Sequence, residues 1–209
     1  MSIEIARVER VEVDLVLASQ LQGVALDGWQ RSVPDRTVEE LQIRFRPDDD
    51  DHLEEVVRTY RYAADQGGLI VAYDTDTSWP PPVGFALAHE AISGGALARA
   101  VKRRLAPQRV FALLRHICVA RAYQGQGIAS RLVEEAYASP TFKDEQIPTA
   151  YAFAENKLAA QALTRWGFVL DPPDQEPKEI DFFGVHRPVQ QRRWAAPSVA
   201  TVRANTRQA

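Results

Sequence analysis

The residues with the clearest chemical potential lie in the segment Gln124–Ser130, which reads Gln-Gly-Gln-Gly-Ile-Ala-Ser and follows the apolar run Val110–Val119. A helical pattern begins directly after the glycines. A helix that starts at the end of a strand presents backbone N–H groups without helical partners, and its dipole adds partial positive charge there. Gly125 and Gly127 leave this backbone free of side chains. The segment therefore predicts a cradle of backbone amides for a diphosphate.

The residues after the glycines suit the same purpose. Ala129 permits close approach, and Ser130 adds a hydroxyl donor. Two other phosphate-binding patterns fit less well: a Rossmann fingerprint has glycine where this chain has Ser130, and a P-loop needs a Gly-Lys-Ser/Thr run that is absent. A turn that uses glycine only for backbone freedom stays open as the structural alternative.

The elements that must position this segment follow from the hydrophobic periodicity. Strands are predicted at residues 3–8, 69–73, 83–89, 110–119 and 149–154, with a closing antiparallel pair at 168–170 and 180–185. Helices are predicted at residues 15–29, 52–66, 127–138 and 156–165, with a helical insertion at 92–105. This alternation predicts an α/β fold whose mixed sheet contains both hairpins and crossovers.

The motif Gln124-x-x-Gly127-x-Ala129 resembles the Gln/Arg-x-x-Gly-x-Gly/Ala signature of the GCN5-related N-acetyltransferases (GNAT). Asn156-x-x-Ala159-Ala160, followed by Trp166-Gly167-Phe168, is similar to the second landmark of that family. The resemblance covers about residues 3–185. It implies a GNAT-like, mostly antiparallel sheet with a central splay, flanked by helices.

The resemblance also implies a function and a cofactor. The expected activity is transfer of an acetyl group from acetyl-CoA to a primary amine of a small molecule or peptide, and homodimers are common on this fold. The expected cofactor-binding residues are the end of one strand, the cradle and the start of a later helix: Ile117, Cys118, Val119, Gln124, Gly125, Gln126, Gly127, Ile128, Ala129, Ser130 and Asn156.

The catalytic groups are harder to assign. Many members of the family carry a tyrosine as general acid where this chain has Leu163. Leu163 favours an alternative, a non-catalytic acyl-CoA-binding regulatory module. The candidate bases are Glu90 and Glu155, which end neighbouring strands, and His116, which a β-bulge would have to rotate into the site. Exposed strand-end carboxylates and a half-buried imidazole are the structural alternatives.

Arg115 is the candidate substrate-binding residue. Counting by twos back from Val119 puts Ile117, Arg115 and Leu113 on the acceptor face of the strand. The planar guanidinium suits a carboxylate of the acceptor, and a salt bridge within the protein is the alternative.

Composition limits the remaining functions. With one cysteine and four scattered histidines, no metal site is expected. The sequence shows no secretory signal and no membrane-crossing run, which predicts a cytoplasmic protein. The net charge of −3 argues against nucleic-acid binding.

We expect one domain over residues 1–186 and a basic, poorly ordered tail over 187–209. An RNA- or protein-binding adaptor that works through this tail stays open.

Overall fold

The computed structural model describes residues 2–29, 50–92, 110–153, 156–171, 178–180 and 189–208. Its strands are β1 (Ile3–Arg7), β2 (Leu69–Asp74), β3 (Pro82–Ile92), β4 (Val110–Val119), β5 (Ile147–Phe153), β6 (Val169–Leu170), β7 (Lys178–Ile180) and β8 (Val189–Ala195). Its helices are α1 (Leu15–Trp29), α3 (Asp50–Asp65), α5 (Ile128–Tyr137), α6 (Lys157–Arg165) and α7 (Val199–Thr206), with short 3-10 turns η1 (Arg10–Glu12) and η2 (Arg121–Tyr123). Beyond Ile92, which ends β3, the predicted insertion lies outside the described residues.

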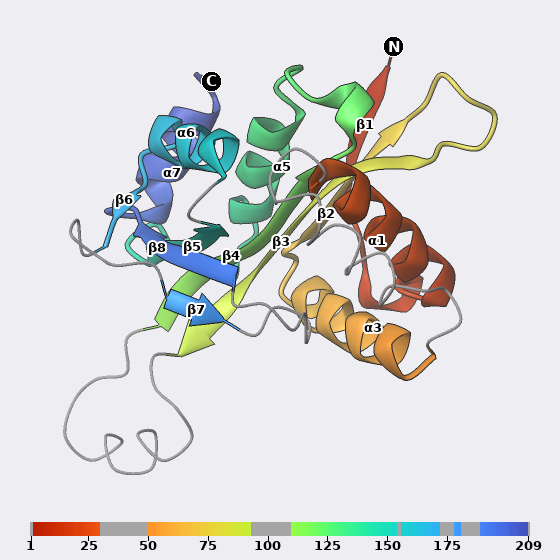
Figure 1. The fold of residues 1–209 in the computed structure, drawn as a ribbon, viewed down its shortest axis with the longest axis horizontal. Coiled ribbons are helices and arrows are strands. Elements are labelled where there is room, and N and C mark those ends of the chain that lie inside the picture. Colours follow the sequence, from red (N-terminus) through yellow and green to blue (C-terminus); the bar gives the residue numbers. More distant parts are fainter. Residues whose placement is uncertain are drawn as a thin grey trace.

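The described strands form one mixed sheet in the order β1-β2-β3-β4-β5-β8-β6, with β7 paired to β8 (Figure 1). Every pair is antiparallel except β4 and β5. Parallel neighbours need a crossover, and α5 supplies it. The predicted α/β fold with a mostly antiparallel sheet is confirmed.

Helices cover both faces of the sheet (Figure 1). α5 and α7 pack with β2–β5 around one apolar core, which includes Leu132, Val133 and Val202. α1 and α3 close a second core on the opposite face, around Leu21 and Tyr60. α3 shows why its sequence folds this way: Val56, Val57, Tyr60, Ala63 and Ala64 are buried at helical spacing, whereas Glu54, Arg58 and Arg61 are exposed.

The end of the chain is part of the domain, so the prediction of a poorly ordered tail after residue 186 is wrong. β8 pairs with β5 from Thr149 opposite Ala195 to Phe153 opposite Gln191. β8 covers the edge of β5 that faces away from β4, so residues 189–195 satisfy backbone groups that this edge would otherwise expose. β6 also pairs with β8. The expected partner strand of residues 168–170, at 180–185, lies outside the described residues beyond Ile180.

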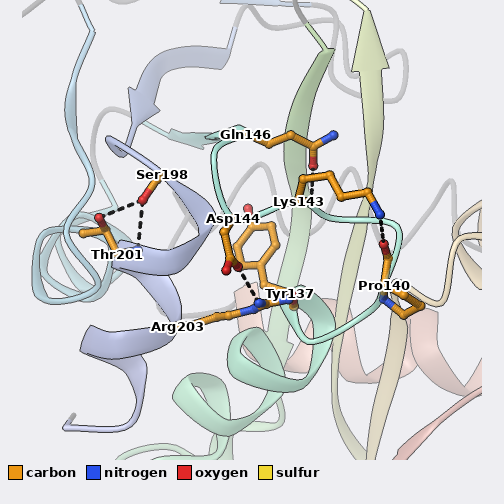
Figure 2. A network of polar contacts seen from close by, with 8 residues as sticks. All are labelled: Tyr137, Pro140, Lys143, Asp144, Gln146, Ser198, Thr201 and Arg203. Atoms are coloured by element: carbon orange, nitrogen blue, oxygen red, sulfur yellow. Dashed lines mark hydrogen bonds and ion pairs between the residues drawn. The ribbon is translucent and has the colours of Figure 1, made fainter.

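α7 packs against α5 and is held there by an arginine (Figure 2). Its Val199 and Val202 are fully buried, and the Ser198 side chain caps its first turn. Arg203 Nε donates a hydrogen bond to the carbonyl oxygen of Tyr137 at 2.7 Å, and Arg203 Nη1 lies 2.6 Å from Asp144 Oδ1. α7 therefore anchors the C-terminal end of α5.

Two further arginines of this segment form ion pairs within the domain. Arg193 pairs with Asp171 at 3.4 Å, and Arg207 pairs with Glu134 at 2.7 Å. With Arg203 also engaged, the arginine-rich end serves the fold, and the adaptor hypothesis loses its main support. No described helix combines the length and apolarity that a membrane crossing requires.

Candidate functional site

The sheet opens between β4 and β5. The two strands pair only from Phe111 opposite Ile147 to Leu114 opposite Ala150. Beyond these residues β4 continues beside β3 as far as Val119, while β5 continues beside β8. Within the described residues, the end of β4 from Ile117 to Val119 therefore does not pair with β5. This is the predicted central splay, and it lies immediately before the cradle.

A β-bulge changes which side chains face each side of β4. Leu87 is opposite His116 and Ala88 is opposite Leu114, so Arg115 is the extra residue. The bulge reverses the alternation: Leu114 and Ile117 both pack toward the α5 core, and Cys118 packs toward α1 and α3.

The bulge bears on two predictions. The assignment of Leu113, Arg115 and Ile117 to one face is wrong, because Leu113 and Ile117 lie on opposite faces of β4. The bulge that would rotate His116 is present, and it places His116 on the α1–α3 face beside Leu87.

The cradle follows β4 and η2. Gly125 and Gly127 have φ of 80° and 76°, which L side chains rarely adopt, and a Cβ at either position would have no atom within 4 Å. Both residues and Gln126 between them are exposed. The first backbone hydrogen bond of α5 runs from Arg131 N to Gly127 O at 3.2 Å. Within the described part of the chain, no backbone group accepts the amides of Gly125 to Ser130.

Two side chains brace the loop. Gln124 Nε2 donates to the Val119 carbonyl oxygen at 3.0 Å and so closes the loop onto the end of β4. Tyr123 Oη donates to Asp74 Oδ2 at 2.7 Å, which ties η2 to the end of β2. This bond raises the pKa of Tyr123, because it stabilises the protonated phenol beside a carboxylate. Sequence reasoning missed the Tyr123–Asp74 pair, because its members are far apart in the chain.

Two predicted cofactor residues use their side chains within the protein. Ser130 is buried, and its hydroxyl oxygen accepts a hydrogen bond from Trp166 Nε1 at 3.0 Å. The expectation that this hydroxyl faces the cradle is therefore wrong, and its backbone amide remains available. Asn156 Oδ1 accepts the Ala159 amide at 2.9 Å and caps α6, as its position before the helix indicates.

The three candidate bases fare differently. Glu90 Oε1 accepts a hydrogen bond at 2.7 Å from Nε2 of Gln146, the residue directly before β5. Glu155 lies outside the described residues. Burial lowers the pKa of His116 to about 3, and the charge of Arg115 adds to that effect. A group with so low a pKa is a weak proton acceptor at pH 7.

Arg115 is exposed on the bulge. Its charge lowers the pKa values of His89 and His116, which places the guanidinium near both imidazoles. No carboxylate within the described ranges forms an ion pair with it. In the same part of the chain, no three His, Cys, Asp or Glu side chains gather in an arrangement that could hold a metal ion.

The cradle and the splay fit coenzyme A together. The free amides at the start of α5 suit a diphosphate, and the unoccupied Cβ positions of Gly125 and Gly127 leave room for it. The end of β4, where pairing with β5 has stopped, suits an extended amide-containing arm, which can bond to a strand edge.

Comparison with known proteins agrees with this geometry. Residues 35–168 match the model of the acetyltransferase (GNAT) family. No curated protein sequence matches the chain. Among solved structures, Chaetomium thermophilum Naa20 in complex with a bisubstrate analogue has a TM-score of 0.61 at 14% identity, and the match covers 95% of this chain and 88% of that one.

Two further structures are similar. Arabidopsis thaliana NAA60 in complex with a bisubstrate analogue has a TM-score of 0.55 at 13% identity, with 93% and 98% of the two chains covered. The PaiA N-acetyltransferase of Thermoplasma acidophilum in complex with coenzyme A has a TM-score of 0.50 at 16% identity, with 92% and 98% covered. At these identities the likeness shows the fold. Because the family model spans more than half of the sequence, the chain belongs to the GNAT acetyltransferase family, whose acyl donor is acetyl-CoA.

Proposed function

We propose that this protein transfers the acetyl group of acetyl-CoA to a primary amine of a small molecule or peptide. The observation that carries the proposal is the row of free amides at Gly125 to Ser130, set at the mouth of the splay between β4 and β5. Acetyl-CoA supplies an activated thioester, and the protein has to hold and orient it against the amine.

Each part of the site has a distinct role in this proposal. The amides at the start of α5 hold the diphosphate, and the end of β4 beside the splay aligns the pantetheine arm. Arg115 stands on the bulge beside the splay and binds an oxygen of the acceptor, either a carboxylate or a carbonyl. Catalysis then comes chiefly from positioning two reactants in one geometry.

The experiment is a thiol-release assay with acetyl-CoA and a panel of amines, combined with mass spectrometry of the products. Amine-dependent thiol release with acetylated product supports the proposal. Hydrolysis at a rate that no amine changes, or no release at all, contradicts it.

A non-catalytic acyl-CoA-binding module is the second candidate, and one observation favours it. Many family members have a tyrosine that acts as general acid where this chain has Leu163. The Leu163 side chain is buried in the core beside α5 and has no proton to donate. Coenzyme A is a tolerable leaving group as a thiolate, so loss of a general acid slows the reaction by about 10²–10⁴-fold without abolishing it. Tight binding of acetyl-CoA without any turnover would favour this candidate.

A further inference from the structure

One row of side chains crosses the sheet next to the splay. His89 on β3 is opposite Leu113 on β4, and Leu113 is opposite Thr149 on β5. Paired residues of a sheet share a face, so His89 and Thr149 flank Leu113 on the α1–α3 side, roughly 10 Å apart. Arg115 and Tyr151 follow two residues further along β4 and β5, where the strands separate.

Both flanking residues carry a buried polar atom without a partner. His89 Nε2 and Thr149 Oγ1 make no hydrogen bond in the described structure. Buried polar atoms are nearly always paired, and each exception calls for a bound ligand or water. These two atoms lie on one face, next to the point where β4 and β5 separate, and a polar ligand bound there would give them partners.

The protonation of His89 follows from its contacts. His89 Nδ1 lies 3.0 Å from the carbonyl oxygen of Glu90, so this nitrogen carries the hydrogen and donates it. Nε2 then holds the lone pair. The Tyr62 ring meets the imidazole edge-on at 5.4 Å and fixes its plane. Neutral His89 thus presents a hydrogen-bond acceptor toward this face.

The charges around His89 keep it neutral. The titratable and charged groups near it are Arg115 and His116 on β4 and Tyr62 on α3. Burial lowers the pKa of His89, the hydrogen bond to Glu90 opposes this, and the charge of Arg115 lowers it further. Within the described residues no carboxylate charge opposes these effects.

We propose that His89 Nε2 accepts the proton of the acceptor amine, and that the acceptor is a peptide α-amino group rather than a lysine side chain. This proposal rests on the proposed acetyl transfer and names its substrate class. The amine nitrogen forms the new N–C bond as the thioester C–S bond breaks. The electron pair leaves with sulfur, and the proton lost by nitrogen passes to Nε2 and then to solvent.

The choice of α-amine follows from the strength of the base and from Arg115. A neutral imidazole is a weak base, and a fixed cation nearby disfavours a second positive charge. An α-ammonium has a pKa of about 7.7–8.0 and a lysine ammonium about 10.4. Near neutral pH the α-amine is therefore uncharged roughly several hundred times more often.

The test uses two matched peptides of one sequence with an internal lysine, one blocked at the α-amine and the other at the lysine. The wild-type protein acetylates the peptide with the free α-amine at least 10-fold faster. His89→Gln lowers kcat on that peptide by about 10²–10⁴-fold and leaves the affinity for acetyl-CoA unchanged. In the wild-type protein, kcat falls on the acid side below pH 6.5, because the pKa of His89 is lowered. This acid limb of the pH profile disappears in His89→Gln and persists in the control His116→Gln.

A measurement without turnover checks the same assignment. In the free protein at pH 7.5, the ¹⁵N chemical shift of His89 Nε2 should be that of an unprotonated ring nitrogen. A protonated Nε2, wild-type kcat in His89→Gln, or equal rates on the two peptides would overturn the inference. If the wild-type protein acetylates only other amines, the inference fails and acetyl transfer stands; if it acetylates no amine at all, the proposed function itself fails.

Discussion

Trp166 Nε1 donates a buried hydrogen bond to Ser130 Oγ at 3.0 Å, and this bond joins the two helices that flank the splay. Ser130 lies in the first turn of α5, directly after the cradle, and Trp166 ends α6. Both side chains belong to the same apolar core region, where few other polar groups are available. The bond therefore fixes the start of α5, whose amides form the cradle.

Loss of this bond should weaken both stability and cofactor binding. Trp166→Phe keeps an aromatic ring but leaves Ser130 with an unpaired oxygen, at an expected cost of about 1–3 kcal/mol in the free energy of unfolding. Chemical denaturation measures the cost. Trp79→Phe is the matched control, because Trp79 is 89% exposed and should change stability by less than about 0.5 kcal/mol. Equal stabilities of the two variants would show that the Trp166–Ser130 bond contributes nothing.

α7 should stabilise the domain through Arg203. Arg203→Gln removes the bonds to Tyr137 and Asp144 shown in Figure 2, and we expect a loss of about 1.5–3 kcal/mol in thermal or chemical unfolding. Arg207→Gln removes only an exposed pair with Glu134, so its effect should stay within about 0–1 kcal/mol. An Arg203→Gln variant no less stable than Arg207→Gln would contradict the anchoring role.

The stability of the protein should fall in mild acid because of His116. Its folded pKa is about 3, below the ordinary value of 6.5, so the unfolded chain binds a proton that the folded chain does not. Stability contributed by neutral His116 is present above pH 6.5 and is lost progressively as the pH falls toward 3. Urea midpoints at pH 7.5, 5.5 and 4.5 measure the slope. His116→Gln should have a shallower slope than the wild type, and an unchanged slope would rule His116 out as its source.

The sequence predicted the cradle because the signal is local. Gly125 and Gly127, the strand before them and the helix after them lie within one short segment, and backbone geometry alone decides how their amides point. The cap at Asn156 is predictable for the same reason. The family resemblance supplied the splay, which no local pattern of β4 or β5 indicates.

Other features depend on contacts between distant residues. The extra residue at Arg115 is set by the register of β4 against β3, so counting by twos back from Val119 assigned Leu113 to the wrong face. Ser130 turns away from the cradle because Trp166 offers it a buried donor. The arginines after residue 186 suggested a solvated tail. Residues 189–195 instead form a strand, because they pair with β5, which is distant in the sequence.

The central claim is that the amides before α5 hold the diphosphate of coenzyme A, and calorimetric titration of acetyl-CoA tests it most directly. Gly127→Glu puts a charged side chain into the open space at the cradle and should lower the affinity at least 100-fold. Gly23→Glu is the control, because Gly23 is an exposed glycine of α1 with equally open surroundings. Binding lost in Gly127→Glu and kept in Gly23→Glu is the predicted result; wild-type affinity in a folded Gly127→Glu variant would contradict the account.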